Sequence, residues 1–252
     1  APSYCVNLVL NIVVTLRMAQ FRRYRVFSHL PRPALETWRA LLAICVPIGL
    51  TVFCEQSIFG AVGLLMAAYG TTVLAAHQAA MNFTTIVYML PLSVSMAITI
   101  LVGYEIGGGR ESGARAYIRL SRVLTLLFVG IVALVLAAMR DTVAALYTTD
   151  PAVQELLQVF LLYALLMQFS DCVNAPLQGA LRGYKDVTVT FWLAVLSFWG
   201  IGLPSGYLLA QYTDLGPYGY WAGLIGGIVV GAVLLMIRLR IIEQRMRRAM
   251  QT

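Results

Sequence analysis

Two acidic residues, Glu55 and Asp171, are candidates for a cation or proton site, because each lies in the middle of a long apolar stretch. Glu55 lies within CVPIGLTVFCEQSIFGAVGLLMAA (45–68), and Asp171 lies within VQELLQVFLLYALLMQFSDCVNAPLQGAL (153–181). A carboxylate at the centre of a membrane helix costs about 2.5–3.5 kcal/mol on insertion scales, and such residues mark ion pathways, proton relays or substrate counter-ions. The alternative is a structural salt bridge, but no Arg or Lys lies within an apolar stretch away from its ends.

Polar side chains at helical spacing accompany the acids. At 100° per residue, three amides fall within about 60° of Asp171: Gln168, Asn174 and Gln178. Pro176 lacks a backbone N–H, which frees the carbonyl of Cys172 as a candidate oxygen ligand. A second stripe lies in another apolar segment and consists of Gln78, Asn82 and Thr85. Hydrogen bonding between helices is the alternative for each residue, but two stripes beside two acids predict a polar, water-accessible cavity.

The composition indicates a membrane protein. Hydrophobic residues make up 60% of the chain and charged residues 12%, whereas soluble domains are typically about 25% charged. Stretches long enough to span a bilayer fall at 4–21, 40–69, 73–104, 116–139, 151–182, 186–212 and 217–240. We therefore expect an all-α fold, a polytopic membrane helical bundle that contacts lipid along most of its length.

The basic residues predict the topology. All of the 18 Lys and Arg residues except Arg140 lie in alternate connections, at 17–39, 110–122, 182–185 and 238–248. By the positive-inside rule these connections and the C-terminus are cytoplasmic. The net charge of +7 is then a topology signal and a contact for lipid headgroups, and we expect no nucleic-acid partner.

The remaining reactive side chains do not form an enzyme's site. The cysteines have no CxxC spacing and His29 and His77 are isolated, so neither a metal cluster nor a catalytic dyad is predicted. No enzymatic activity and no cofactor beyond a coupling ion are expected. Two structural patterns remain: Asp150–Pro151 is typical of a helix start, and glycines at 219, 223, 227 and 231 predict close helix packing, within the lobe or between copies.

The start of the chain suggests part of a longer protein. It begins with APSY, without Met, and its first apolar segment is short for a span. We expect 1–21 to be the end of a preceding helix and 22–38 to be a cytoplasmic inter-lobe linker. The range 39–240 would then be a six-helix lobe, and 241–252 a basic cytoplasmic tail.

Several long runs resemble the multidrug and toxic compound extrusion (MATE) family, from the end of its sixth helix through its twelfth. AAHQAAMNFTTIVYMLPLSVSMAITILVGYEIGGGR (75–110) resembles the eighth helix and following loop, QGALRGYKDV (178–187) the junction of helices ten and eleven, and IGLPSGYLLA (201–210) the eleventh helix. In NorM-type members, acids on helices seven and ten form a cation or proton site, and those positions match Glu55 and Asp171. The pattern departs at Met167, where NorM-type members often carry a Tyr before Gln168.

The resemblance implies the C-terminal half of a two-lobe antiporter that exports organic cations and other amphiphiles against Na⁺ or H⁺. Its partners would be membrane lipid, small organic cations and an N-terminal lobe, in a bacterial inner membrane. A flippase for lipid-linked oligosaccharides is the main alternative, although it would need positive charge in the cavity. A membrane lobe that does not itself transport is the other.

Overall fold

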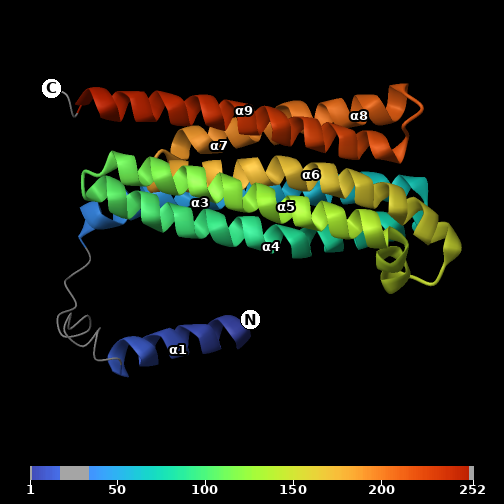
Figure 1. Cartoon of the computed structure of the whole chain (residues 1–252), viewed down its shortest axis with the longest axis horizontal. Helices are drawn as coiled ribbons and strands as arrows, with labels where there is room; N and C mark the ends of the chain where they lie inside the picture. The colour runs from blue at the N-terminus through green and yellow to red at the C-terminus, as the bar shows by residue number, and fades with distance from the viewer. Residues whose placement is uncertain (1, 18–33, 250–252) are drawn as a thin grey trace. The chain divides into compact units, whose positions relative to one another are not determined.

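The computed structural model describes residues 2–17 and 34–249 (Figure 1). The chain divides into two compact units, residues 1–43 and 44–252. In the first unit the described structure is α1 (Pro2–Arg17) and the first residues of α3. The predicted segment 1–21 therefore contains a helix, and most of the predicted linker 22–38 lies outside the described residues.

The second unit is helical throughout its described residues. Its elements are α3 (Leu35–Met66, which begins in the first unit), η1 (Ala67–Tyr69), α4 (Thr71–Gly107), α5 (Glu111–Tyr147), α6 (Pro151–Gly183), α7 (Val187–Val195), η2 (Leu196–Gly202), α8 (Leu203–Tyr212) and α9 (Pro217–Ala249). Within the described chain, six helical segments are long and apolar enough to cross a membrane. The predicted all-α membrane bundle is confirmed.

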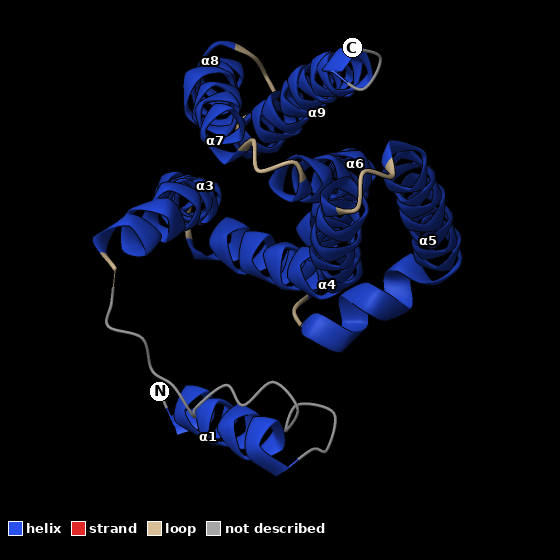
Figure 2. Ribbon diagram, turned by 90° about the vertical axis from the view of Figure 1, so that its left-hand side faces the viewer, coloured by secondary structure: helices blue, strands red, loops and turns tan. Residues whose placement is uncertain are grey.

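Helix α6 lies at the centre of the second unit. It packs against α4, α5 and α9, while α9 also packs against α7, η2 and α8. Figure 2, which looks nearly along the helices, shows α4, α5 and α6 as neighbours and α7 to α9 as a second group. Its central position explains why α6 is almost wholly buried from Asn174 to Leu181.

Two helical segments differ from the predicted spans. The expected span 116–139 is part of a longer helix, since α5 begins at Glu111 and continues past a kink at Met139 (φ −127°, ψ 22°). Ala114, Ile118 and Ser121 are buried along one face, so the polar start of α5 packs on the core like the rest of the helix. The expected span 186–212 is interrupted by η2, a π-helical turn.

The glycines of α9 allow η2 and α8 to pack closely on it. A methyl group built at Gly227 would lie 2.7 Å from the Ser197 carbonyl oxygen and 2.8 Å from the Gly202 Cα. A methyl group built at Gly223 would likewise collide with the backbone of Gly206 in α8. The predicted groove of small residues is therefore filled within the lobe.

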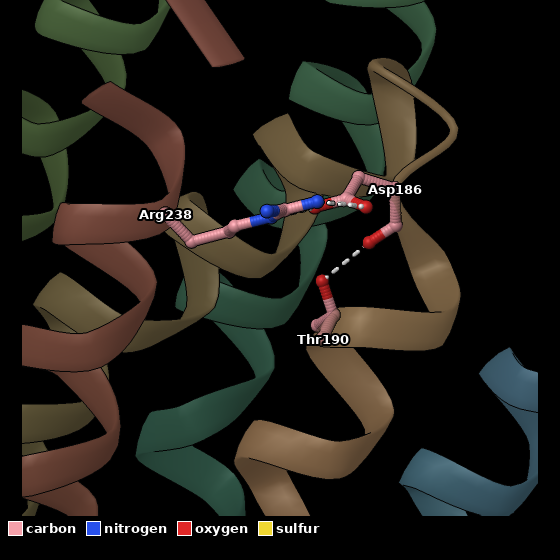
Figure 3. Close-up of polar contacts among 3 residues, drawn as sticks. All are labelled: Asp186, Thr190 and Arg238. Carbon is pink, nitrogen blue, oxygen red and sulfur yellow. Dashed lines mark hydrogen bonds and ion pairs between the residues drawn. The ribbon is translucent and has the colours of Figure 1, made fainter. Parts of the chain in front are cut away.

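Local contacts at the ends of the helices fix the bundle. Asp150 Oδ1 accepts from the backbone N–H of Ala152 at 2.9 Å, and Pro151 follows it, so the predicted helix start is confirmed. At the start of α7, the Asp186 carboxylate receives both the Nε and the Nη2 of Arg238 at 2.6 and 3.0 Å (Figure 3). This bidentate pair attaches α7 to α9. Arg238, interpreted above only as a topology signal, therefore also has a structural partner.

His77 belongs to the apolar core. Its Nδ1 accepts a hydrogen bond from Trp221 Nε1 at 3.1 Å, and its ring also packs edge-on against Phe160. Trp221 and Phe160 are both fully buried. A buried indole N–H needs an acceptor, and His77 supplies one.

Candidate functional site: a cavity with two carboxylates

A cavity of about 250 Å³ lies between α3, α4, α6 and η2 in the second unit. Its lining combines acids and amides with aromatic and methionine side chains. The lining residues are Glu55, Gln56, Phe59, Met81, Thr84, Thr85, Tyr88, Met89, Leu92, Met167, Asp171, Asn174, Ala175, Gln178 and Phe198. Both sequence-predicted carboxylates thus face one cavity, although they are 116 residues apart in the chain (171 − 55).

Glu55 is held by an amide that is itself held by an arginine. The Gln178 Nε2 donates to Glu55 Oε1 at 2.6 Å, and Arg182 Nη2 donates to Gln178 Oε1 at 3.2 Å. Since the guanidinium can only donate, it leaves the amide nitrogen of Gln178 directed at the carboxylate. A polar chain therefore runs from Arg182, near the C-terminal end of α6, to Glu55 in the cavity.

Asp171 faces the same cavity without such support. The half-buried Asp171 makes no side-chain hydrogen bond with any residue that the structure describes. Two carboxylates in one low-dielectric cavity repel each other when both are ionised, and a bound cation or a shared proton relieves that repulsion. The arrangement thus has the chemistry of a site for a small cation or a proton.

The other predicted residues fall into two groups. Asn174, Gln178 and Thr85 line the cavity, whereas Gln168, Gln78 and Asn82 are not among its lining residues. Gln168 is fully buried and donates from Nε2 to the Thr84 carbonyl at 2.9 Å. Asn82 Oδ1 accepts from the Tyr147 hydroxyl at 3.2 Å, which ties α4 to α5. Gln78 is exposed, one turn before Asn82 on α4.

The carbonyl of Cys172 is not a cavity ligand. Pro176 leaves it without its helical N–H partner, as expected, but the Thr125 hydroxyl of α5 donates to it at 2.8 Å. Both groups are buried. A freed carbonyl in an apolar bundle needs a donor, and Thr125 of α5 supplies one. Cys172 is also not among the residues that line the cavity, so the structure gives this carbonyl a structural partner and not the expected place as a ligand.

Tyr88 and Gln56 line the cavity but were not predicted from the sequence. Tyr88 follows Met81, Thr84 and Thr85 at intervals of three or four residues, and Leu92 continues the same face of α4. That spacing could have identified Tyr88. An aromatic side chain therefore does face the carboxylates, although it comes from α4 and not from position 167 of α6.

Comparison with known proteins gives the family. Residues 47–208 match the family model MatE. The chain is 45% identical over 249 residues to the probable multidrug resistance protein NorM of Halalkalibacterium halodurans, which covers 99% of this chain and 54% of that protein. It is 49% identical over 245 residues to the protein with the same description from Geobacillus kaustophilus, covering 97% of this chain and 54% of that protein. The chain thus spans about half the length of these curated relatives.

Solved structures show the same fold at lower sequence identity. The eukaryotic MATE transporter AtDTX14 superposes with a TM-score of 0.87 at 20% identity, over 98% of this chain and 56% of that one. The Vibrio cholerae MATE transporter VcmN in its bent form gives a TM-score of 0.82 at 17% identity, over 96% of this chain and 55% of that one. These likenesses establish the fold of the helical lobe. The match of the family model over residues 47–208 shows that this chain belongs to the MATE family, whose members are transporters and not enzymes.

Proposed function

We propose that this chain forms the C-terminal lobe of an antiporter that exports organic cations and other drugs in exchange for Na⁺ or H⁺. In this proposal Glu55 and Asp171 hold the coupling ion. The observation that carries it is the placement of both acids on one cavity with aromatic and methionine walls. The description of the relatives as probable multidrug resistance proteins supports the same assignment.

The residues that line the cavity suit the exchange of a coupling ion for a cationic drug. Methionine and aromatic side chains adapt to apolar ligands of varied shape, and two carboxylates attract a positive charge. A coupling ion and a cationic drug would compete for that charge, so binding one favours release of the other. Net transport then requires that each ligand binds the inward- and outward-open states with different affinity.

In transporters built from two repeats, access to the two sides of the membrane alternates as one repeat moves against the other, and this chain supplies one six-helix lobe. We therefore propose an N-terminal lobe as the partner, in a bacterial inner membrane with the C-terminus of this chain in the cytoplasm. The basic clusters at alternate connections support that orientation.

The flippase alternative is disfavoured by the charge of the cavity. Its lining contains two acids and, among the described residues, no Lys or Arg. A pyrophosphate-linked substrate would need cationic groups there.

The test is efflux of ethidium from liposomes that contain the whole transporter, with a Na⁺ or a proton gradient imposed separately. We expect efflux under one of the two gradients. Glu55→Gln and Asp171→Asn should each abolish it without loss of membrane expression, because each removes a negative charge from the cavity. The matched control is Glu155→Gln, which makes the same chemical change at an exposed position of α6. Normal gradient-driven efflux in both cavity variants would refute the proposal.

A further inference from the structure

A second, much smaller cavity adjoins the carboxylate cavity. Its volume is about 10 Å³, and it is lined by residues of α6, α7, η2 and α9. Asn174, Gln178 and Phe198 line both cavities. The two cavities therefore share part of their walls.

Two buried polar atoms beside this cavity have no hydrogen-bond partner. Asn174 is 3% exposed and Ser197 is 1% exposed, and neither Asn174 Oδ1 nor Ser197 Oγ meets a donor or acceptor in the described part of the chain. Buried side-chain oxygens are almost always hydrogen bonded to protein or to an ordered water. The two residues come from different helical elements and line one cavity, which points to a ligand that joins them.

The size and polarity of the cavity fit one water molecule. A volume of about 10–15 Å³ by this measure is what a buried water requires, together with two to four polar partners. The polar lining residues are Asn174, Gln178, Thr190 and Ser197, and all four are neutral. A metal ion would have to leave water for a site without a charged ligand, which is costly. Water carries no such penalty.

The walls of the cavity are held in place by contacts outside it. The Thr190 hydroxyl donates to the Asp186 carbonyl at 2.7 Å, while the Asp186 carboxylate binds Arg238 (Figure 3). The ion pair thus fixes the α7 wall, with Thr190, against the α9 wall, with Gly231. Ser197 lies in the π-helical turn η2, and such turns recur at functional sites.

We propose that one buried water occupies this cavity, donates hydrogen bonds to Asn174 Oδ1 and Ser197 Oγ, and so makes Asn174 a positioning residue for the carboxylate cavity. A fixed Asn174 presents a constant polar surface to Asp171, three residues earlier on α6. The effect on transport rests on the proposed function, whereas the presence of the water does not.

Gly231 of α9 offers a way to fill the cavity without substituting either proposed ligand of the water. A methyl group at Gly231 would lie 3.2 Å from Ser197 Oγ and 4.0 Å from Asn174 Nδ2, so Gly231→Ala fills the cavity. The matched control is Gly226→Ala on the same helix, where a methyl group meets no atom within 4 Å. Ser197→Ala is a second variant, which removes one partner of the water without adding volume.

The first measurement is the structure of the whole transporter in lipid, at a resolution that shows buried waters. We expect density between Asn174 and Ser197 in the parent protein and in Gly226→Ala, no such density in Gly231→Ala, and weaker density in Ser197→Ala. In efflux assays, Gly231→Ala should raise the coupling-ion concentration for half-maximal rate several-fold while the maximal rate changes little. Gly226→Ala should leave both values unchanged.

Three results would overturn the proposal. The first is an absence of density at this site in a map that shows other buried waters. The second is density whose occupancy follows the Na⁺ concentration, since the occupant would then be an ion. The third is unchanged ion dependence in Gly231→Ala although the density is gone, which would refute the positioning role. If the transporter shows no efflux at all, the proposed function fails, but the density still decides whether the water exists.

Discussion

The contact between α4 and α6 gives the sharpest prediction for stability, because it depends on a missing side chain. A methyl group built at Gly179 of α6 would collide with the backbone carbonyl of Ser95 on α4 and lie 2.8 Å from its hydroxyl. Thr99 Oγ1 also donates to the Gly179 carbonyl at 3.0 Å. The two helices thus meet backbone to backbone, and Gly179→Ala should force them apart.

The size of the effect follows from three contributions. Overpacking a tight interior costs about 1–3 kcal/mol, and we take the upper part of this range because the colliding atom belongs to the backbone. Weakening the Thr99 hydrogen bond adds about 0.6 kcal/mol, the average for such bonds in membranes. The higher helix propensity of alanine stabilises α6 by about 1 kcal/mol and offsets part of this loss. The net loss is about 2 kcal/mol, which corresponds to a fall of about 4–8 °C in unfolding midpoint for a unit of this size.

The assay is thermal unfolding of the purified transporter, with Gly130→Ala as the matched control. At Gly130, in the middle of α5, a methyl group meets no atom within 4 Å, so the control should keep or raise the midpoint. We therefore expect Gly179→Ala to lower the unfolding midpoint and Gly130→Ala to leave it unchanged or raise it. Equal midpoints for the two variants would show that α4 and α6 are not in backbone contact at Gly179.

Two further predictions concern hydrogen bonds that cross between helices. Trp221→Phe leaves His77 Nδ1 buried without its donor, so we expect a loss of about 1–3 kcal/mol, measured as a lower unfolding midpoint; an unchanged midpoint would contradict the role of this bond. Asp186→Asn breaks the charged pair with Arg238; the Asp186 side chain is 17% exposed and the Arg238 side chain 23%. We expect a loss of about 1–2 kcal/mol of stability, measured in the same way. Glu105→Gln is the comparison: Glu105 is 12% exposed, but its partner Arg110 is 54% exposed, so solvent screens this pair more and we expect a smaller loss. Equal losses in the two variants would refute the distinction.

The sequence predicted the membrane bundle well because hydropathy and charge report directly on the bilayer. The predicted span at 116–139 began too late, since α5 starts at Glu111 and its polar first turns bury Ala114 and Ile118 along one helical face. The π-helical turn at Leu196–Gly202 was missed for another reason. Gly202 of this turn lies against Gly227 of α9, and such tertiary contacts leave no local pattern in the sequence.

For the candidate site, the sequence identified the polar residues of each helix better than it identified which of them face the cavity. Helical spacing places Gln78, Asn82 and Thr85 on one side of α4, but only Thr85 lines the cavity. Spacing fixes the relative angle of side chains on one helix, whereas the rotation of that helix toward its neighbours is set by packing. The same reasoning explains the carbonyl of Cys172: Pro176 shows that it is freed, but only the structure shows Thr125 beside it.

The packing of the lobe also limits how the carboxylate cavity can change shape. Asp171 and Tyr88 lie on α6 and α4, which are in backbone contact at Gly179 and cannot slide past each other without a clash. Glu55 lies on α3, which is joined to the cavity wall by the Gln178 amide and by Trp199 Nε1 donating to the Cys54 carbonyl at 3.2 Å. Side-chain hydrogen bonds reform at a lower cost than close backbone packing. A change in the separation of the two carboxylates therefore requires less rearrangement through movement of α3 than through movement between α4 and α6.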